Sequence, residues 1–130
     1  MKSAGCVFGF LTFALLFFIV FCVAGTVQAR EDIQRTEKEC WYREREAVLL
    51  ADTREYLSDA GFCNSGVTLN RVVDEEGVRS YTFTIHHRRI DCMDEAGRQR
   101  LCGELKTLTD SFVKTAQKDR CTFAYRFLTL

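Results

Sequence analysis

The chain has 130 residues, enough for one domain, and it carries 18 Lys and Arg against 18 Asp and Glu. Only Lys2 among these charges lies ahead of Arg30, so the part from residue 30 onward is close to neutral. A neutral balance excludes the basic footprint of a nucleic-acid-binding protein, and the chain has no acidic tail or basic arm. We therefore expect no DNA or RNA partner.

The N-terminal segment is apolar, with no charged side chain over residues 7–27. About 20 helical residues at roughly 1.5 Å each cross a hydrocarbon core of about 30 Å. The segment also has the parts of a signal peptide, with Lys2 as a basic start and small residues before a cleavage point after position 29. Residues 1–29 are therefore predicted to be a cleaved signal peptide or an uncleaved anchor, which would meet the membrane through residues 7–27.

The side of the membrane depends on two opposing signals. The short N-terminal tail and the small residues 27–29 favour export of the domain. The excess of basic residues beyond the segment favours a cytoplasmic domain. We expect export, and hence a secreted or cell-envelope protein that is membrane-anchored if residues 1–29 are retained. The basic residues concerned are Arg30, Arg35, Lys38, Arg43 and Arg45.

Residues 31–60 are predicted to form a helix, because they are rich in Glu, Arg, Ala and Leu. Gly61 is well placed to end it in a left-handed cap. If the apolar segment stays attached, the helix continues directly from it with no breaker except Gly25. A loose inward stripe consists of Trp41, Val48, Leu50, Ala51 and Leu57.

A β-hairpin is predicted next, with strands at residues 67–73 and 78–89 joined by the turn-like residues 74–77. The second strand alternates regularly, which indicates one buried face and one solvent face. The buried set is Tyr81, Phe83 and Ile85, and the solvent set is Ser80, Thr82 and Thr84.

A second domain helix is predicted after Asp91 as N-cap, with Asp94 completing a pair like a capping box. Its apolar residues recur at helical spacing, and a third strand with one apolar face follows at residues 121–130. These faces consist of Leu101, Leu105, Leu108 and Phe112 in the helix, and of Cys121, Phe123, Tyr125 and Phe127 in the strand.

The order of elements predicts an α+β fold. Residues 30–130 form one small domain of order α-β-β-α-β, with two helices packed on one face of a three-stranded sheet. A hydrophobic N-terminal helix precedes this domain. If the second and third strands run parallel, their crossover is expected to be right-handed.

Five cysteines lie in the predicted domain, and Cys6 and Cys22 lie in the apolar segment. An exported domain of this size with spaced cysteines typically holds disulfides, here two bridges and one remaining thiol. The alternative is buried thiols that act as small apolar side chains, as the positions of Cys102 and Cys121 allow. No Cys-x-x-Cys pair is present, so no metal site is expected. The disulfide candidates are Cys40, Cys63, Cys92, Cys102 and Cys121.

Residues 86–89 (His-His-Arg-Arg) form the most conspicuous polar cluster. On a strand, His86 and Arg88 share the solvent face, where they could bind an anion such as a phosphate or carboxylate. The alternative is a solvated strand face whose charges discourage edge pairing. His87 falls on the buried face, so the two histidines cannot line one site. No nucleophile–base signature accompanies them, and we expect neither an enzyme nor a cofactor.

In layout the chain resembles pilin-type and pseudopilin subunits, in which an apolar N-terminal helix continues into an amphipathic helix packed on a small sheet. That family has a glycine followed by an apolar run with glutamate at its fifth position. Gly9 and Phe10 match the pattern, whereas Ala14 stands at the position of the glutamate. The resemblance implies an assembly subunit as one alternative.

The function expected from these features is that of a non-enzymatic exported or membrane-anchored protein that acts through contacts with an unidentified protein partner. A small anion- or ligand-binding module on the sheet face is the second expectation. A pilin-like assembly subunit is the third, and it rests on layout alone.

Overall fold

The computed structural model describes residues 4–116 and 119–129, with side chains from residue 9 onward. Its elements are α1 (Ala4–Asp59), β1 (Gly66–Val73), β2 (Arg79–His86), α2 (Arg88–Asp91), α3 (Glu95–Thr115) and β3 (Cys121–Phe127). The chain divides into two compact units, a first of Met1–Tyr42 and a second of Arg43–Leu130, and the boundary between them falls inside α1. The boundary predicted after residue 29 concerns processing of the chain and stays a prediction.

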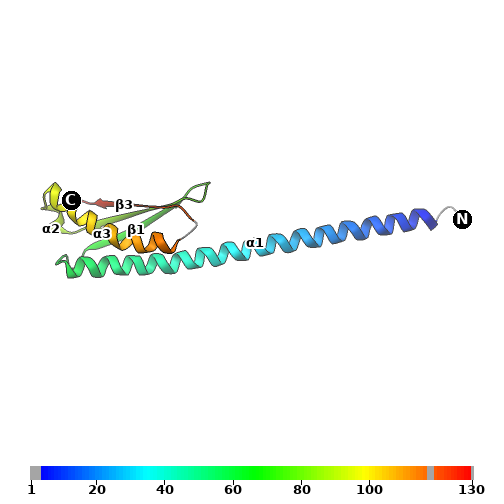
Figure 1. Ribbon diagram of the computed structural model, residues 1–130, viewed down its shortest axis with the longest axis horizontal. Helices are drawn as coiled ribbons and strands as arrows, with labels where there is room; N and C mark the ends of the chain where they lie inside the picture. Colours follow the sequence, from blue (N-terminus) through cyan, green and yellow to red (C-terminus); the bar gives the residue numbers. More distant parts are fainter. Residues whose placement is uncertain (1–3, 117–118, 130) are drawn as a thin grey trace. The chain divides into compact units, whose positions relative to one another are not determined.

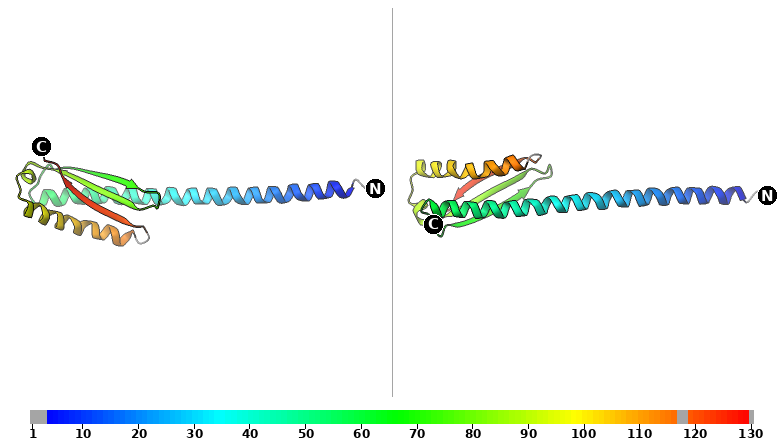
Figure 2. Two further views of the ribbon diagram at one scale, coloured as in Figure 1. Left: turned by 90° about the horizontal axis from the view of Figure 1, so that it is seen from above. Right: turned by 60° about the horizontal axis from the view of Figure 1, so that its bottom comes forward.

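The second unit has the predicted α+β fold. β1 and β2 pair antiparallel, β2 and β3 pair parallel, and the sheet order is β1-β2-β3. The part of α1 after residue 42 and α3 lie together on one face of this sheet (Figures 1 and 2). The order α-β-β-α-β and the placement of both helices on one face are thereby confirmed.

The alternation of β2 decides which face of the sheet is buried. Tyr81, Phe83 and Ile85 are at most 1% exposed, and the residues between them face the solvent side. Stacked aromatic pairs continue the buried face into β3, where Phe83 lies 5.2 Å from Tyr125 between ring centroids. Cross-strand aromatic pairs of this kind add about 0.2–1 kcal/mol each to sheet stability. The inward face predicted for β3 is confirmed as half-buried Cys121, Phe123, Tyr125 and Phe127.

The inward stripe of α1 includes Leu57, as predicted, but differs from the prediction at Val48. Leu49, Thr53 and Leu57 are at most 4% exposed, whereas Val48 is 54% exposed. The prediction followed apolar character and missed that Thr53 lies inward, where its hydroxyl donates to the carbonyl of Leu49 at 2.7 Å. This internal hydrogen bond lets a polar side chain occupy a core position.

Three element boundaries also differ. The predicted second strand ran to residue 89, but β2 ends at His86 and the short helix α2 follows. The predicted N-cap Asp91 lies at the end of α2, and Asp94 caps α3 by accepting from Gly97 N at 2.8 Å. The last strand ends at Phe127, and residue 130 lies outside the described residues.

Gly61 ends α1 as predicted, in a left-handed cap with φ of +90°. Its N–H donates to the carbonyl of Ser58 at 3.0 Å, and the N–H of Phe62 donates to that of Leu57 at 2.7 Å. This pair of bonds is the Schellman motif, and the buried Phe62 and Leu57 give it the usual apolar contact.

Gly61→Ala is expected to destabilise the domain by about 1–2 kcal/mol, because a Cβ is strained at this φ. The new Cβ would also lie 3.2 Å from Nη1 of Arg89. Gly103→Ala is the matched control: it lies inside α3 with open space around it, so it should stabilise by about 0.5–1 kcal/mol. Denaturant unfolding of the full chain in micelles measures both, and shifts of the same sign would contradict this account of the cap.

Candidate functional site

The apolar part of α1 is exposed on every side. Between Phe10 and Val27 its large apolar side chains are 50–80% exposed, and none packs into a core. The stretch from Gly9 to Val27 has no charged residue and rises about 28 Å, close to the roughly 30 Å of a hydrocarbon core. The helix is therefore long and apolar enough to cross a membrane, a property that a signal sequence near the N-terminus shares.

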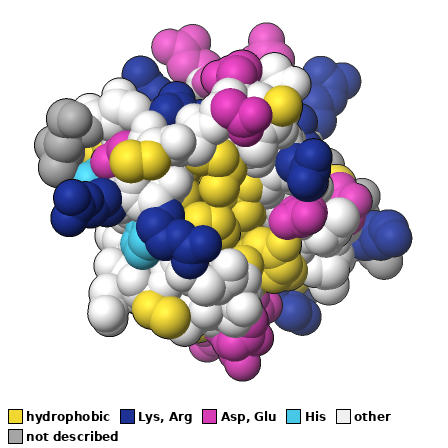
Figure 3. All heavy atoms as spheres, turned by 90° about the vertical axis from the view of Figure 1, so that its left-hand side faces the viewer, with side chains coloured by type: hydrophobic (Ala, Val, Ile, Leu, Met, Phe, Trp, Pro, Cys, Tyr) yellow, Lys and Arg dark blue, Asp and Glu magenta, His cyan; other side chains and the backbone are white. Residues whose placement is uncertain are grey.

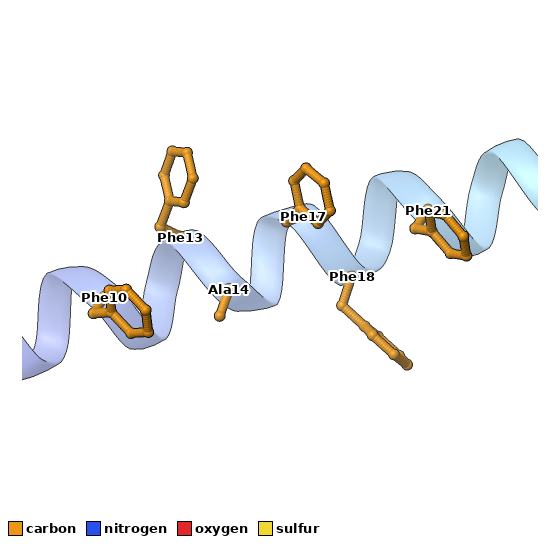
Figure 4. Close-up of a pocket in the computed structure, with 6 residues that line it drawn as sticks. All are labelled: Phe10, Phe13, Ala14, Phe17, Phe18 and Phe21. Atoms are coloured by element: carbon orange, nitrogen blue, oxygen red, sulfur yellow. The ribbon is translucent and has the colours of Figure 1, made fainter.

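A hollow opens on one side of this helix (Figure 4). Phe13 and Phe17 project along one edge, Phe18 projects along the other, and Phe10 and Phe21 close the ends. Ala14, the sixth lining residue, leaves the space between the rings. All six residues belong to one helix, so the hollow has a single wall and is no enclosed ligand cavity.

A groove lies between α3 and β3 in the second unit. Its volume is about 240 Å³, and it is located where α3 begins and β3 ends. Figure 3 views this end of the domain and shows hydrophobic side chains in a recessed centre surrounded by charged ones. Such a pattern, apolar in the middle with a polar rim, is typical of protein-binding surfaces. The lining residues are Glu95, Arg98, Gln99, Cys102, Tyr125 and Phe127.

Tyr125 is held in this groove by its hydroxyl, which donates to the carbonyl of Leu105 at 2.9 Å. Burial raises the pKa of Tyr125 to about 12. Tyr56 joins α1 to α3 by donating to Oε2 of Glu104 at 2.6 Å. That hydrogen bond, with a smaller contribution from burial, raises the pKa of Tyr56 to about 12.

We expect Tyr56 and Tyr125 to ionise near pH 12 in the folded chain rather than near 10. Because both folded pKa values are raised, their contribution to stability is complete below pH 10 and falls as the pH rises through about 12. Ultraviolet absorbance of tyrosinate during alkaline titration measures this, with Tyr56→Phe and Tyr125→Phe to assign the steps. Ionisation of either side chain near pH 10 before unfolding would contradict these placements.

The structure does not place His86 and Arg88 together on the sheet face. His86 ends β2, whereas Arg88 begins α2 and is exposed. Nε2 of His86 lies 3.6 Å from Oδ2 of Asp91, so a carboxylate is the near neighbour of the imidazole. The two residues do not share a strand face because α2 turns the chain after His86, and anion binding by His86 and Arg88 stays a prediction.

His87 has a structural role. Its Nδ1 accepts from the N–H of Arg89 at 3.1 Å, which makes it the N-cap of α2. Its ring lies edge-on to Phe62 with centroids 5.5 Å apart. Arg89 completes this contact by donating to the carbonyl of Gly61 at 2.9 Å. The cluster at residues 86–89 therefore ties α2 to the end of α1.

Glu46 was not predicted, and its carboxylate joins α1 to β1 and β2 through Arg71 and Tyr81. Its Oε1 accepts from the hydroxyl of Tyr81 at 2.8 Å and lies 3.2 Å from Nη1 of Arg71. Tyr81 is 1% exposed, and burial together with the bond to Glu46 raises its pKa well above the ordinary value. The sequence carried one signal, since Arg71 shares the inward face of β1 with Val67 and Leu69 and needs a buried partner.

The six cysteines whose side chains the structure describes form no disulfide, so the predicted bridges are absent. Cys102 lines the groove beside Tyr125, and Cys121 lies four residues before Tyr125 on β3. Cys6 lies outside the residues whose side chains are described. The described cysteines are Cys22, Cys40, Cys63, Cys92, Cys102 and Cys121.

Among the described residues, no group of three or more His, Cys, Asp or Glu side chains is arranged to hold a metal ion. Comparisons of the chain with protein-family models, with curated proteins and with solved structures find no match.

Proposed function

We propose that this chain is an exported, membrane-anchored protein whose α+β domain acts through contact with another protein. The observation that carries the proposal is the apolar helix at Gly9–Val27, which exposes its large side chains on every side. Exposed apolar surface loses about 25 cal/mol of stabilisation for each Å² left in water. A bilayer removes that surface from water without any change in the helix.

Retention of the segment is supported by the continuity of α1. The predicted cleavage point after Ala29 lies inside a regular helix that runs from Ala4 to Asp59. A helix through this point keeps its peptide bonds within the hydrogen-bonded ladder, so cleavage requires unwinding around Arg30. A cleaved, secreted domain is the alternative that the experiments below separate.

The contact role of the domain is supported by the groove between α3 and β3. Tyr125 and Phe127 are half-buried there, and charged and amide side chains at the start of α3 form its rim.

Anchoring and orientation are tested in membranes from the native host. The chain should resist extraction with alkaline carbonate, and a membrane-impermeant maleimide should label Cys63 and Cys92, which are exposed in the domain, from outside. Cys22 lies in the apolar segment and is the internal control, since the bilayer should shield it. A carbonate-soluble chain contradicts the anchor, and labelling only after lysis contradicts export.

The groove is tested with a photo-crosslinking residue at Gln99 on its rim, in the same membranes. A matched probe at Glu75, in the turn between β1 and β2, samples the domain surface elsewhere. We expect a specific adduct from position 99 that disappears when Cys102→Trp fills the groove. Identical adducts from both positions would show that the groove is not the contact surface.

A further inference from the structure

β3 is the edge strand of the sheet on the side where the groove lies. Its ladder to β2 uses alternate residues, as where the N–H of Leu128 donates to the carbonyl of Ile85 at 2.9 Å. In a parallel pair of this register, the residues in between direct their backbone groups away from β2. The backbone N–H and C=O groups of Phe123, Tyr125 and Phe127 therefore point out of the sheet edge, and none of them bonds to another described residue.

The other elements leave this edge open. At the opposite edge, the carbonyl of Val67 on β1 accepts from Nη2 of Arg54 on α1 at 3.1 Å. α3 joins α1 through Glu104, which accepts from Tyr56 and lies about 200° around the helix from Cys102 in the groove. The flank of α3 beside β3 therefore faces away from α1, and Figure 2 shows β3 at the border of the sheet next to α3.

β3 also lacks most of the features that protect an exposed edge from pairing. Its seven residues pair with β2 in an unbroken register without a bulge, and the strand has no proline. Its one charged side chain is Arg126, which is exposed on the face of the sheet away from the groove and makes no ion pair with a described residue. Edges that are not used for pairing are typically short, bulged, charged or covered. An edge of this kind pairs readily with another strand.

We propose that the groove and the β3 edge together bind an extended segment of the partner protein, which adds a fourth strand to the sheet. The inference rests on the proposed contact role of the domain and names the form of its partner. Main-chain hydrogen bonds supply affinity in this mode of recognition, and pockets for alternate side chains supply specificity. A helix or a folded surface would leave the outward backbone groups of Phe123, Tyr125 and Phe127 unpaired, whereas an extended chain pairs them.

The two faces of β3 define the side chains that the added strand carries. Successive side chains of a strand point to opposite faces, so every second one enters the groove against Tyr125 and Phe127. The side chains between them lie beside Thr122, Ala124 and Arg126 on the exposed face. A carboxylate opposite Arg126 would stabilise the pairing by its opposite charge. We therefore expect a segment that alternates apolar and polar residues and has an acidic residue opposite Arg126.

Photo-crosslinking along β3 in membranes from the native host tests the added strand. The crosslinking residue is placed in turn at positions 122, 124 and 126 on the exposed face, and at positions 68 and 70 of β1 as the matched control. We expect the three β3 positions to react with one partner segment at sites about two residues apart and in order along it, because paired strands advance together. The β1 positions should give no such series.

The other outcomes separate this inference from the proposed contact role. Adducts from β3 that scatter over several segments, or that lie three to four residues apart as on a helix, would overturn strand addition. An adduct from position 99 without any from β3 would also overturn it, while leaving contact through the groove in place. No adduct from position 99 or from β3 would refute the contact role itself.

Backbone pairing is tested with a synthetic peptide of the crosslinked segment, added to the full chain in micelles. The amides of Phe123, Tyr125 and Phe127 should exchange with solvent about tenfold more slowly, or slower still, when the peptide is bound, as measured by nuclear magnetic resonance. N-methylation of the peptide amides that face β3 removes donors without changing side chains, and it should weaken binding about tenfold or more. N-methylation of the alternate amides, which face away from β3, is the matched control. Equal binding of the two methylated peptides, or unchanged exchange at these three amides, would overturn the proposal.

Discussion

The double variant Leu16→Asp, Val20→Asp is expected to move the chain from the membrane fraction to the soluble or aggregated fraction. The two side chains are 61% and 66% exposed and lie one turn apart in the middle of the apolar stretch. An aspartate at the centre of a membrane helix costs about 2.5–3.5 kcal/mol, so two cost about 5–7 kcal/mol. This cost is about ten times the free energy that any single apolar residue of the segment contributes to membrane insertion.

The control for this variant places the same charges outside the apolar stretch. Ala47 and Ala51 are also four residues apart and exposed on α1. Ala47→Asp, Ala51→Asp should leave the chain in carbonate-resistant membranes at the wild-type level. If the Leu16 and Val20 variant fractionates like this control, the apolar helix is not what holds the chain in the membrane.

Glu46→Ala is expected to lower the free energy of unfolding of the domain by about 2–3 kcal/mol, because it removes the acceptor of a buried hydroxyl and one ion pair. The hydroxyl of Tyr81 is buried and loses its acceptor, and Arg71 loses the carboxylate 3.2 Å away. Tyr81→Phe removes the hydroxyl as well as its need for a partner, so we expect a smaller loss of about 1 kcal/mol. Denaturant unfolding followed by near-ultraviolet circular dichroism measures both variants.

Glu55→Ala provides the reference for helix and charge effects, since Glu55 is exposed on the same helix. It should change stability by no more than about 0.5 kcal/mol. A Glu46→Ala variant as stable as this reference would mean that the carboxylate contributes nothing to the packing of α1 on the sheet.

The fold was predictable where one face of an element is apolar and the other polar. β2 shows this most clearly, because Tyr81, Phe83 and Ile85 alternate strictly with polar residues and are all buried. The stripe of α1 was not predictable in the same way, because Thr53 and Glu46 lie inward among exposed apolar neighbours. Each satisfies its polar atoms within the fold, by contacts that a pattern of apolar residues does not reveal.

The candidate sites also differ in how far the sequence alone could predict them. A helix long and apolar enough to cross a membrane could be identified from the sequence, because composition and length alone determine that property. The contact between His86 and Asp91 could not be predicted, because it depends on the turn made by α2. The alternation of the sequence predicted that the strand continues through this turn. The groove at Cys102 and Tyr125 lies between α3 and β3, which only the tertiary fold brings together, so no local sequence signal predicts it.

The central claim is that the apolar part of α1 stays on the mature protein and spans the membrane. Intact-mass spectrometry of the chain purified from native membranes tests it most directly. We expect a mass that includes residues 1–29, with the protein in the carbonate-resistant fraction. A mass corresponding to a chain that begins at Arg30, recovered in the soluble fraction, would contradict it.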